Sequence, residues 1–342
     1  MVVRQRQGAL TTAASTRPLE PRALKDTGKE SHVAAPAARR QVRRSSAVRR
    51  TGGQPVRWVR FDAGDGPRIG RLEGDLVLPV AADGIQDVIA GRGTEPEGSK
   101  LPVTEVRLLA PVTPSKVLAV GQNYLDHVRE QGIEPPGVPL LFAKFPTSVI
   151  GPGEEIRWTA GLTEQVDYEA ELAVVMGRRA TRVGVAAAME HVFGYTGAND
   201  VSARDLQFGD GQWTRGKGLD RFLPLGPVVV DAGELPDQCD VAIRCRVNGE
   251  LVQDASTREM VFSVAEIIAF ASEAITLEPG DVLLTGTPKG VGYFREPQLF
   301  LSPGDIVEVE IGDFGVLSNP VGEPYPSAAT AALAGAFVKG ER

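Results

Sequence analysis

The sequence predicts a β-rich α+β protein in which short helices accompany the strands. Its 342 residues include 39 glycines and 25 prolines, which favours a turn-rich β-fold over a helical bundle. Short apolar runs end at Gly, Pro, Asn or Asp, as strands joined by tight turns do. Apolar residues make up 42% and charged residues 24% of the chain, as in an ordinary globular enzyme.

The charge is unevenly distributed. Residues 1–54 hold twelve Lys or Arg against three Asp or Glu, so the net charge of −7 divides into +9 there and −16 elsewhere. We expect a disordered basic tail without a catalytic role, with a transit peptide or an over-long start as alternatives. The acidic remainder argues against a nucleic-acid-binding domain. No apolar run reaches 18 residues, so we expect no membrane span.

Residues 55–110 predict a small N-terminal α+β domain. We expect a strand over 58–61, a hairpin over 68–78 with its turn at 73–75, and a short helix over 85–89. We see no chemistry in this domain. Residues 111–326 form the expected catalytic domain, and the Ala-rich segment 327–342 is a C-terminal tail for which a helix is one option.

Two further signals lie in the second half of the chain. Asn248-Gly249 marks a tight hairpin turn, and Ser263 with Glu266 forms a capping box that begins a helix. The two cysteines, Cys239 and Cys245, lie six residues apart in one expected strand, which makes them poor disulfide partners and too few for structural zinc. A reducing cytoplasm is the simplest location.

A pair of carboxylates opens the expected strand over 166–177. Glu169 and Glu171 are two residues apart, so they project from one face roughly 7 Å apart at Cα. Asp200 follows a second Gly-rich apolar strand. Buried carboxylates need a cation, and an all-oxygen set suits Mg²⁺ or Mn²⁺ better than zinc. The alternative for the glutamate pair alone is an edge strand with a solvated face.

A histidine and a carboxylate follow the apolar strand 117–120. His127 and Glu130 are three residues apart, which makes them neighbours on a helix. The carboxylate would fix the imidazole tautomer and raise its basicity, unless the two form an ordinary solvated pair.

Lys217 closes a segment that only superficially matches a phosphate-binding loop, because Gly218 stands where Ser or Thr would hold Mg²⁺.

These segments together resemble the fumarylacetoacetate hydrolase family. The family patterns V-G-x-N-Y-x-x-H, E-x-E, a later Asp, R-D-x-Q, a Lys and T-G-T-P-x-G-V-G occur in order between residues 111 and 321. Three residues after Lys217, namely Gly218, Leu219 and Arg221, depart from the usual family sequence and bear on substrate identity.

The resemblance implies a mixed β-roll or sandwich with the metal at one end, and a homodimer. It implies a small 2-oxo acid substrate and Mg²⁺ or Mn²⁺ as cofactor. The implied metal ligands are Glu169, Glu171 and Asp200. The implied catalytic residues are His127, Glu130 and Lys217. The implied substrate-binding residues are Tyr124, Arg204, Gln207 and Thr287.

The expected activity is metal-dependent hydrolysis of a C–C bond in a 2,4-dioxo acid of the acylpyruvate or fumarylpyruvate type. His127, oriented by Glu130, would activate water, and the site would stabilise the leaving enolate. The same site suits an alternative: an isomerase, tautomerase or decarboxylase acting on a 2-hydroxymuconate or 2-oxo diacid in aromatic catabolism. A non-catalytic metal-binding scaffold is a third reading, which gives the His127–Glu130 pair no role.

Overall fold

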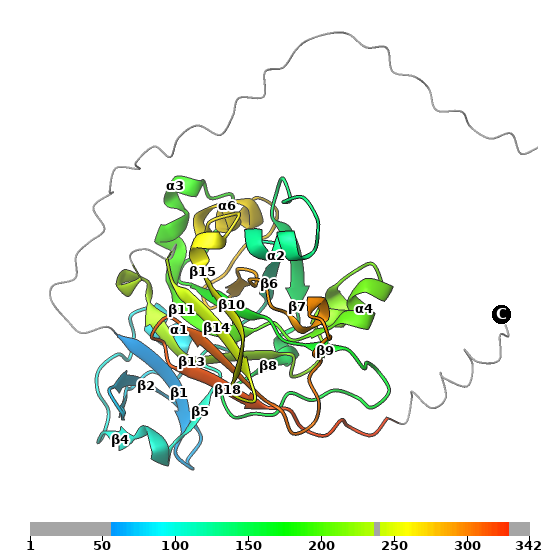
Figure 1. The fold of residues 1–342 in the computed structure, drawn as a ribbon. Helices are drawn as coiled ribbons and strands as arrows, with labels where there is room; N and C mark the ends of the chain where they lie inside the picture. Colours follow the sequence, from blue (N-terminus) through cyan, green and yellow to red (C-terminus); the bar gives the residue numbers. More distant parts are fainter. Residues whose placement is uncertain (1–55, 236–239, 328–342) are drawn as a thin grey trace, which may run out of the picture. The chain divides into compact units, whose positions relative to one another are not determined.

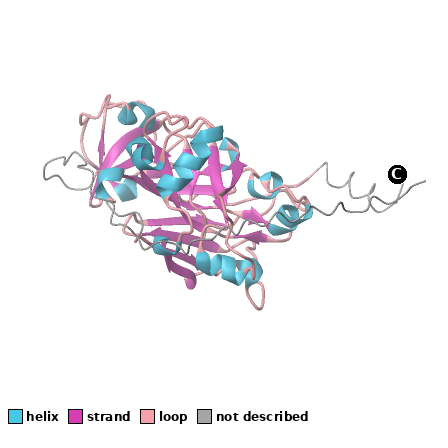
Figure 2. Ribbon diagram, turned by 90° about the horizontal axis from the view of Figure 1, so that it is seen from above, coloured by secondary structure: helices cyan, strands magenta, loops and turns pink. Residues whose placement is uncertain are grey.

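The computed structural model describes residues 56–235 and 240–327. The expectations for 1–54, for 328–342 and for Cys239 lie outside these residues. The predicted class is confirmed, since strands form the centre and short helices lie around them (Figures 1 and 2). The helices are α1 (Ile85–Ile89), α2 (Leu125–Glu130), α3 (Val185–Ala188), α4 (Arg204–Gly209), α5 (Thr214–Lys217) and α6 (Val264–Ala274).

The strands follow the chain in three groups. The first group is β1 (Arg57–Asp62), β2 (Pro67–Glu73), β3 (Leu76–Pro79), β4 (Leu101–Pro102) and β5 (Arg107–Leu109). The second is β6 (Val117–Gly121), β7 (Leu140–Lys144), β8 (Val149–Ile150), β9 (Val166–Asp167), β10 (Ala170–Met176), β11 (Val192–Asn199), β12 (Ser202–Ala203) and β13 (Leu223–Asp231). The third is β14 (Ala242–Val247), β15 (Glu250–Ser256), β16 (Val282–Leu284), β17 (Ile306–Ile311) and β18 (Val316–Pro320).

The main sheet brings four strand ends to one edge. Its order runs β4-β3-β2-β1-β13-β11-β10-β16-β6-β7. Strand β10 is antiparallel to β11 and β16, and β16 is parallel to β6. The start of β10 therefore lies beside the ends of β11, β16 and β6. The segments that follow those ends carry Asp200, Thr287 and His127, so the sheet topology collects the predicted site residues at this edge.

The sheet also curls and is covered by a second sheet. After β7 the chain turns into β8, which pairs in parallel with β13 on the other side of the site. A four-stranded sheet in the order β15-β14-β17-β18 packs across the middle of the main sheet, with β17 against β11 and β18 against β13. The result is a rolled sandwich whose strands β10 and β14 lie close together (Figure 1).

Several local expectations are confirmed. The hairpin of β2 and β3, the helix α1, the hairpin at Asn248-Gly249 and the capping box of Ser263 with Glu266 are all present. Cys245 is buried in β14. No helix among the residues that the structure describes is long and apolar enough to cross a membrane.

The expected strand over 166–177 is interrupted, which is a difference from the prediction. The chain leaves β9 at Asp167 and enters β10 only at Ala170, so Glu169 precedes the strand. The Glu169 N–H donates to the side-chain oxygen of Asn199 at 3.0 Å, while its carbonyl accepts from Asp200 N at 2.8 Å. These two bonds join the break to the end of β11.

The close approach of β11 to β13 gives a test of the fold. A Cβ added at Gly194 would lie 2.2 Å from the Val230 carbonyl oxygen, a backbone atom that cannot move aside. We expect Gly194→Ala to lower the free energy of unfolding by about 1–3 kcal/mol, measured by urea denaturation. Gly209→Ala is the matched control, because no atom lies within 4 Å of its added Cβ. Equal stability of the two variants would contradict the close approach.

Candidate active site and metal centre

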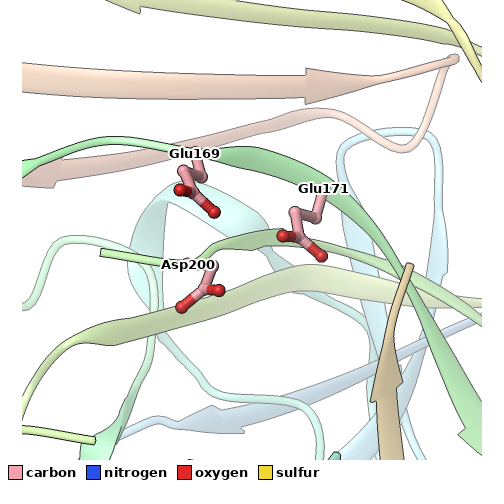
Figure 3. Close-up of side chains that lie close together, drawn as sticks. All are labelled: Glu169, Glu171 and Asp200. Atoms are coloured by element: carbon pink, nitrogen blue, oxygen red, sulfur yellow. The ribbon is translucent and has the colours of Figure 1, made fainter. Parts of the chain in front are cut away.

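Three buried carboxylates meet at the sheet edge. Oxygen atoms of Glu169, Glu171 and Asp200 all lie within 4.8 Å of one another. Figure 3 shows the three carboxylate groups facing a common space, the two glutamates from one segment and Asp200 from the next. All three residues are buried, with no more than 5% of any of them exposed. The spacing of Glu169 and Glu171 thus places both on one face even though β10 begins between them.

Three buried cations contact these carboxylates. Lys217 Nζ donates to Glu169 Oε2 at 2.7 Å and to Asp200 Oδ2 at 3.0 Å. Arg204 Nη1 lies 2.6 Å from Glu169 Oε1. Lys144 Nζ donates to Asp200 Oδ1 at 2.6 Å, to the Val201 carbonyl and to the Lys217 carbonyl. Lys144 uses all three ammonium hydrogens in this way. Burial nevertheless lowers the pKa of Lys144 below its usual value, while the charge of Asp200 opposes that shift.

The charges of this cluster differ in how well they are compensated. Burial alone would raise the pKa of Glu169, but Lys217 and Arg204 outweigh it and lower that pKa to about 2. Burial raises the pKa of Glu171 well above its usual value, and the charges of Asp200 and Glu169 raise it further. Glu171 accepts a hydrogen bond from Gly286 N at 2.7 Å. Of the three carboxylates, Glu171 is the one without an ion-pair partner in the described structure.

This donor set fits a divalent cation. A cation of charge two would offset the charge of Glu171, the carboxylate whose ionisation the buried site otherwise opposes. Its ligands would be carboxylate oxygens, which suit hard ions such as Mg²⁺ or Mn²⁺. Glu169, Glu171 and Asp200 would hold the ion, while Lys144 and Gly286 fix the orientation of Asp200 and Glu171.

Asp167 organises the neighbouring arginine and was not singled out from the sequence. Its Oδ2 accepts from Arg204 Nε at 2.8 Å and from Tyr293 N at 3.0 Å, and its Oδ1 accepts from Gly292 N at 2.7 Å. Arg204 Nη1 also donates to Gln207 Oε1 at 3.0 Å. The buried Arg204 Nη2 has no hydrogen-bond partner in the described structure, so a substrate oxygen would satisfy it.

The predicted His127–Glu130 pair is formed. His127 Nδ1 lies 2.7 Å from Glu130 Oε2 on α2. Glu130 Oε1 in turn accepts from Gly290 N at 2.9 Å. The edge of the Phe294 ring packs near the imidazole, with the centroids 5.9 Å apart. Because Nδ1 is engaged, Nε2 is the nitrogen left to exchange a proton with a bound molecule.

A pocket of about 460 Å³, including its open side, joins these groups. Six predicted residues line it: His127, Glu169, Arg204, Gln207, Lys217 and Thr287. Its apolar wall includes Phe142, Phe208, Trp213 and Phe294. Gln122 and Gln131 complete the polar lining. Sequence reasoning did not single out these aromatic residues or the two glutamines. Gln122 lies at the variable position of the V-G-x-N-Y-x-x-H pattern, which does not specify the residue there.

The remaining predicted residues lie behind the pocket wall. Asp200 pairs with the lining Lys217, and Glu130 with the lining His127. Glu171 is hydrogen-bonded to Gly286 N. Thr287, by contrast, is one of the lining residues. Its hydroxyl donates to the Ala170 carbonyl at 3.0 Å and accepts from Gln253 Nε2 at 2.9 Å, so the side chain is fixed in position. Tyr124 is fully buried in the core and is not a lining residue, so the expected contact with substrate has no support in its position.

The comparisons with known proteins agree with these motifs. The sequence model of the fumarylacetoacetate (FAA) hydrolase C-terminal family matches residues 116–322. The chain belongs to the fumarylacetoacetate hydrolase family. Residues 56–111 match a second family, Rv2993c-like, N-terminal. The two matched ranges meet between β5 and β6, although β1 pairs with β13 and continues the main sheet of the family domain.

Two relatives of this chain are named as oxaloacetate tautomerases. Oxaloacetate tautomerase FAHD2A, mitochondrial, of Homo sapiens is 46% identical over 68% of this chain and 75% of its own length. Oxaloacetate tautomerase fahd2, mitochondrial, of Xenopus laevis is 48% identical over 64% of this chain and 69% of its own length.

Solved structures share the fold. The 5-carboxymethyl-2-hydroxymuconate delta-isomerase from Mycobacterium smegmatis has a TM-score of 0.68 at 39% identity and covers 78% of this chain and 99% of its own. Fumarylacetoacetate hydrolase from Exiguobacterium antarcticum has a TM-score of 0.72 at 41% identity with the same coverage. Since both tautomerases above are named as mitochondrial, the cytoplasmic location stays a prediction, as does the homodimer.

The raised pKa of Glu171 gives a test of the metal centre. Its folded-state pKa exceeds that in the unfolded chain, so its stabilising contribution is present at low pH and is lost as the pH rises through the folded-state pKa. Glu171→Gln keeps an oxygen for Gly286 N and removes the charge. We expect this variant to stabilise the metal-free protein at neutral pH and to weaken Mg²⁺ binding at least about tenfold.

Thermal unfolding in chelator and in Mg²⁺ measures both effects. The control is Glu250→Gln, which removes an exposed carboxylate on β15 and should behave as the parent protein does. Stabilisation of Glu171→Gln by Mg²⁺ to the same extent as the parent would exclude Glu171 as a ligand.

Proposed function

We propose that this protein is a tautomerase of small 2-oxo dicarboxylic acids, of which oxaloacetate is the simplest with a removable proton at C3. The observation that carries the proposal is the His127–Glu130 pair on the wall of a pocket whose cations, Arg204 and Lys217, contact a carboxylate cluster. The names of the oxaloacetate tautomerases that resemble this chain support the same reaction. The family also contains hydrolases, so C–C bond hydrolysis is the competing activity.

The cationic groups would bind the 2-oxo acid end of the substrate. Arg204 Nη2 supplies a buried N–H without a protein partner, and Lys217 lies between Glu169 and Asp200 at the same end. A divalent ion held by the three carboxylates would act there as a Lewis acid toward the 2-oxo acid oxygens. Arg204 and Lys217 would orient the substrate carboxylate and stabilise negative charge that develops on the C2 oxygen.

The proton transfer falls to the histidine. His127 Nε2 would remove a proton from C3 of the keto form. The electron pair of that C–H bond would form the C2–C3 double bond, while the π pair of the C2 carbonyl would move onto its oxygen. The same proton would be returned to the C2 oxygen, so atoms and charge balance in the enol. Glu130 stabilises the imidazolium in between, and Gly290 N holds Glu130 in place.

A tautomerase assay tests this function. Oxaloacetate would be added as the enol, and the loss of enol absorbance would be followed in Mg²⁺ and in chelator. We expect His127→Ala to reduce the rate by about 10²–10⁴ because the general base is lost. Glu130→Gln should reduce the rate less than His127→Ala does, since the amide oxygen of the new side chain can still accept a hydrogen bond from Gly290 N.

His191→Ala is the matched control. His191 lies in a 3-10 turn after α3, away from the pocket, and its loss should leave the rate unchanged. Pyruvate release from acylpyruvates, measured with the same preparations, reports the competing hydrolase activity. An enol decay no faster with the parent protein than with buffer would refute the tautomerase proposal.

A further inference from the structure

The polar lining of the pocket divides into two sets. One set is tied to the carboxylate cluster: Arg204 and Lys217 contact Glu169, and Gln207 accepts from Arg204. The other set is an amide pair, Gln122 and Gln131, whose side chains are hydrogen-bonded to each other at 3.4 Å. In the part of the chain that the structure describes, no hydrogen bond joins the amide pair to the cluster.

Gln122 adopts a backbone conformation that its side chain disfavours. Its φ is +58°, in the left-handed region that glycine or asparagine occupies more easily. The preceding Gly121 packs closely against Trp213, since a Cβ added at Gly121 would lie 2.4 Å from the Trp213 ring. A glutamine that lines a pocket in a strained conformation indicates that its side chain has a role there.

The amide pair retains hydrogen-bond donors. Gln122 Nε2 donates one N–H to Gln131 Oε1. Within the described residues, no protein acceptor takes the Nε2 group of Gln131, so its two N–H groups and the second N–H of Gln122 remain for a ligand. A carboxylate accepts several such bonds at once. Gln131 also follows α2 directly, so the pair lies next to the helix that carries His127.

We propose that Gln122, supported by Gln131, is the specificity residue that binds the second carboxylate of the substrate. This inference rests on the proposed function, because it places a 2-oxo diacid in the pocket with its 2-oxo acid end at the cluster. The diacid then spans from Arg204 and Lys217, past His127, to the amide pair. The amides distinguish a diacid from a 2-oxo acid of the same length that ends in a methyl group.

The test compares oxaloacetate with 2-oxobutyrate, which replaces the second carboxylate by a methyl group. Calorimetric affinities of both for the full chain in Mg²⁺ give a discrimination ratio. Gln122→Glu keeps the size of the side chain but places a negative charge beside the second carboxylate. We expect it to weaken oxaloacetate binding about tenfold or more and to change 2-oxobutyrate binding less than about threefold.

A second variant separates recognition from folding. Gln122→Gly relieves the positive φ, so it should raise the melting temperature while lowering the discrimination ratio. Arg182→Gly is the control, since Arg182 has a φ of +51° on the exposed surface and lines no part of the pocket. Arg182→Gly should raise the melting temperature without changing the discrimination ratio between oxaloacetate and 2-oxobutyrate. In turnover, Gln122→Glu should raise KM for oxaloacetate more than it lowers kcat.

The outcomes distinguish the two proposals. An unchanged ratio in Gln122→Glu, with the parent protein still active on the oxaloacetate enol, would overturn the role of Gln122 and leave the tautomerase proposal standing. If the parent protein binds neither compound, the pocket does not take 2-oxo acids and both proposals fall.

Discussion

Charge compensation among buried groups is the constraint on which this site depends. Carboxylates within 4.8 Å of one another repel strongly in a dry interior, and each must be paired or neutralised. Lys217 and Arg204 pair Glu169, Lys144 and Lys217 pair Asp200, and Glu171 keeps a raised pKa. Glu171 is the carboxylate that the described cations leave without an ion pair, so a divalent ion held by the cluster would supply the compensating charge that this carboxylate lacks.

The sheet makes that compensation possible. An antiparallel strand that starts where its neighbours end brings four chain segments to one edge, and each contributes a short polar stretch there. The curl from β7 through β8 to β13 brings Lys144 to Asp200 from outside this group of strands. The Asp167 carboxylate then joins Arg204 to the backbone at Gly292 and Tyr293. The positions of these charged groups therefore depend on contacts between segments that lie far apart in the sequence.

The part of the site that follows local rules could be predicted. The two-residue period of an extended chain put Glu169 and Glu171 on one face, and the three-residue spacing on a helix paired His127 with Glu130. Contacts that depend on the curl of the sheet could not be predicted from the sequence. Lys144 is an example, because it lies at the end of β7 and only the curl of the sheet through β8 to β13 brings it to Asp200. Tyr124, which belongs to a family motif, is fully buried in the core at the residue before α2, and the motif alone does not show which way its side chain faces.

The cluster end of the site does not by itself select the reaction. Charge on the C2 oxygen is stabilised at the cluster end in the same way whether a proton or an acyl group leaves C3, so Arg204, Lys217 and the three carboxylates favour both outcomes equally. The bond that breaks at C3 is the one held perpendicular to the plane of the C2 carbonyl. That alignment is set by where the far end of the substrate is bound. Under the proposed function, selection between proton transfer and C–C cleavage would therefore rest on the pocket wall and on the amides of Gln122 and Gln131.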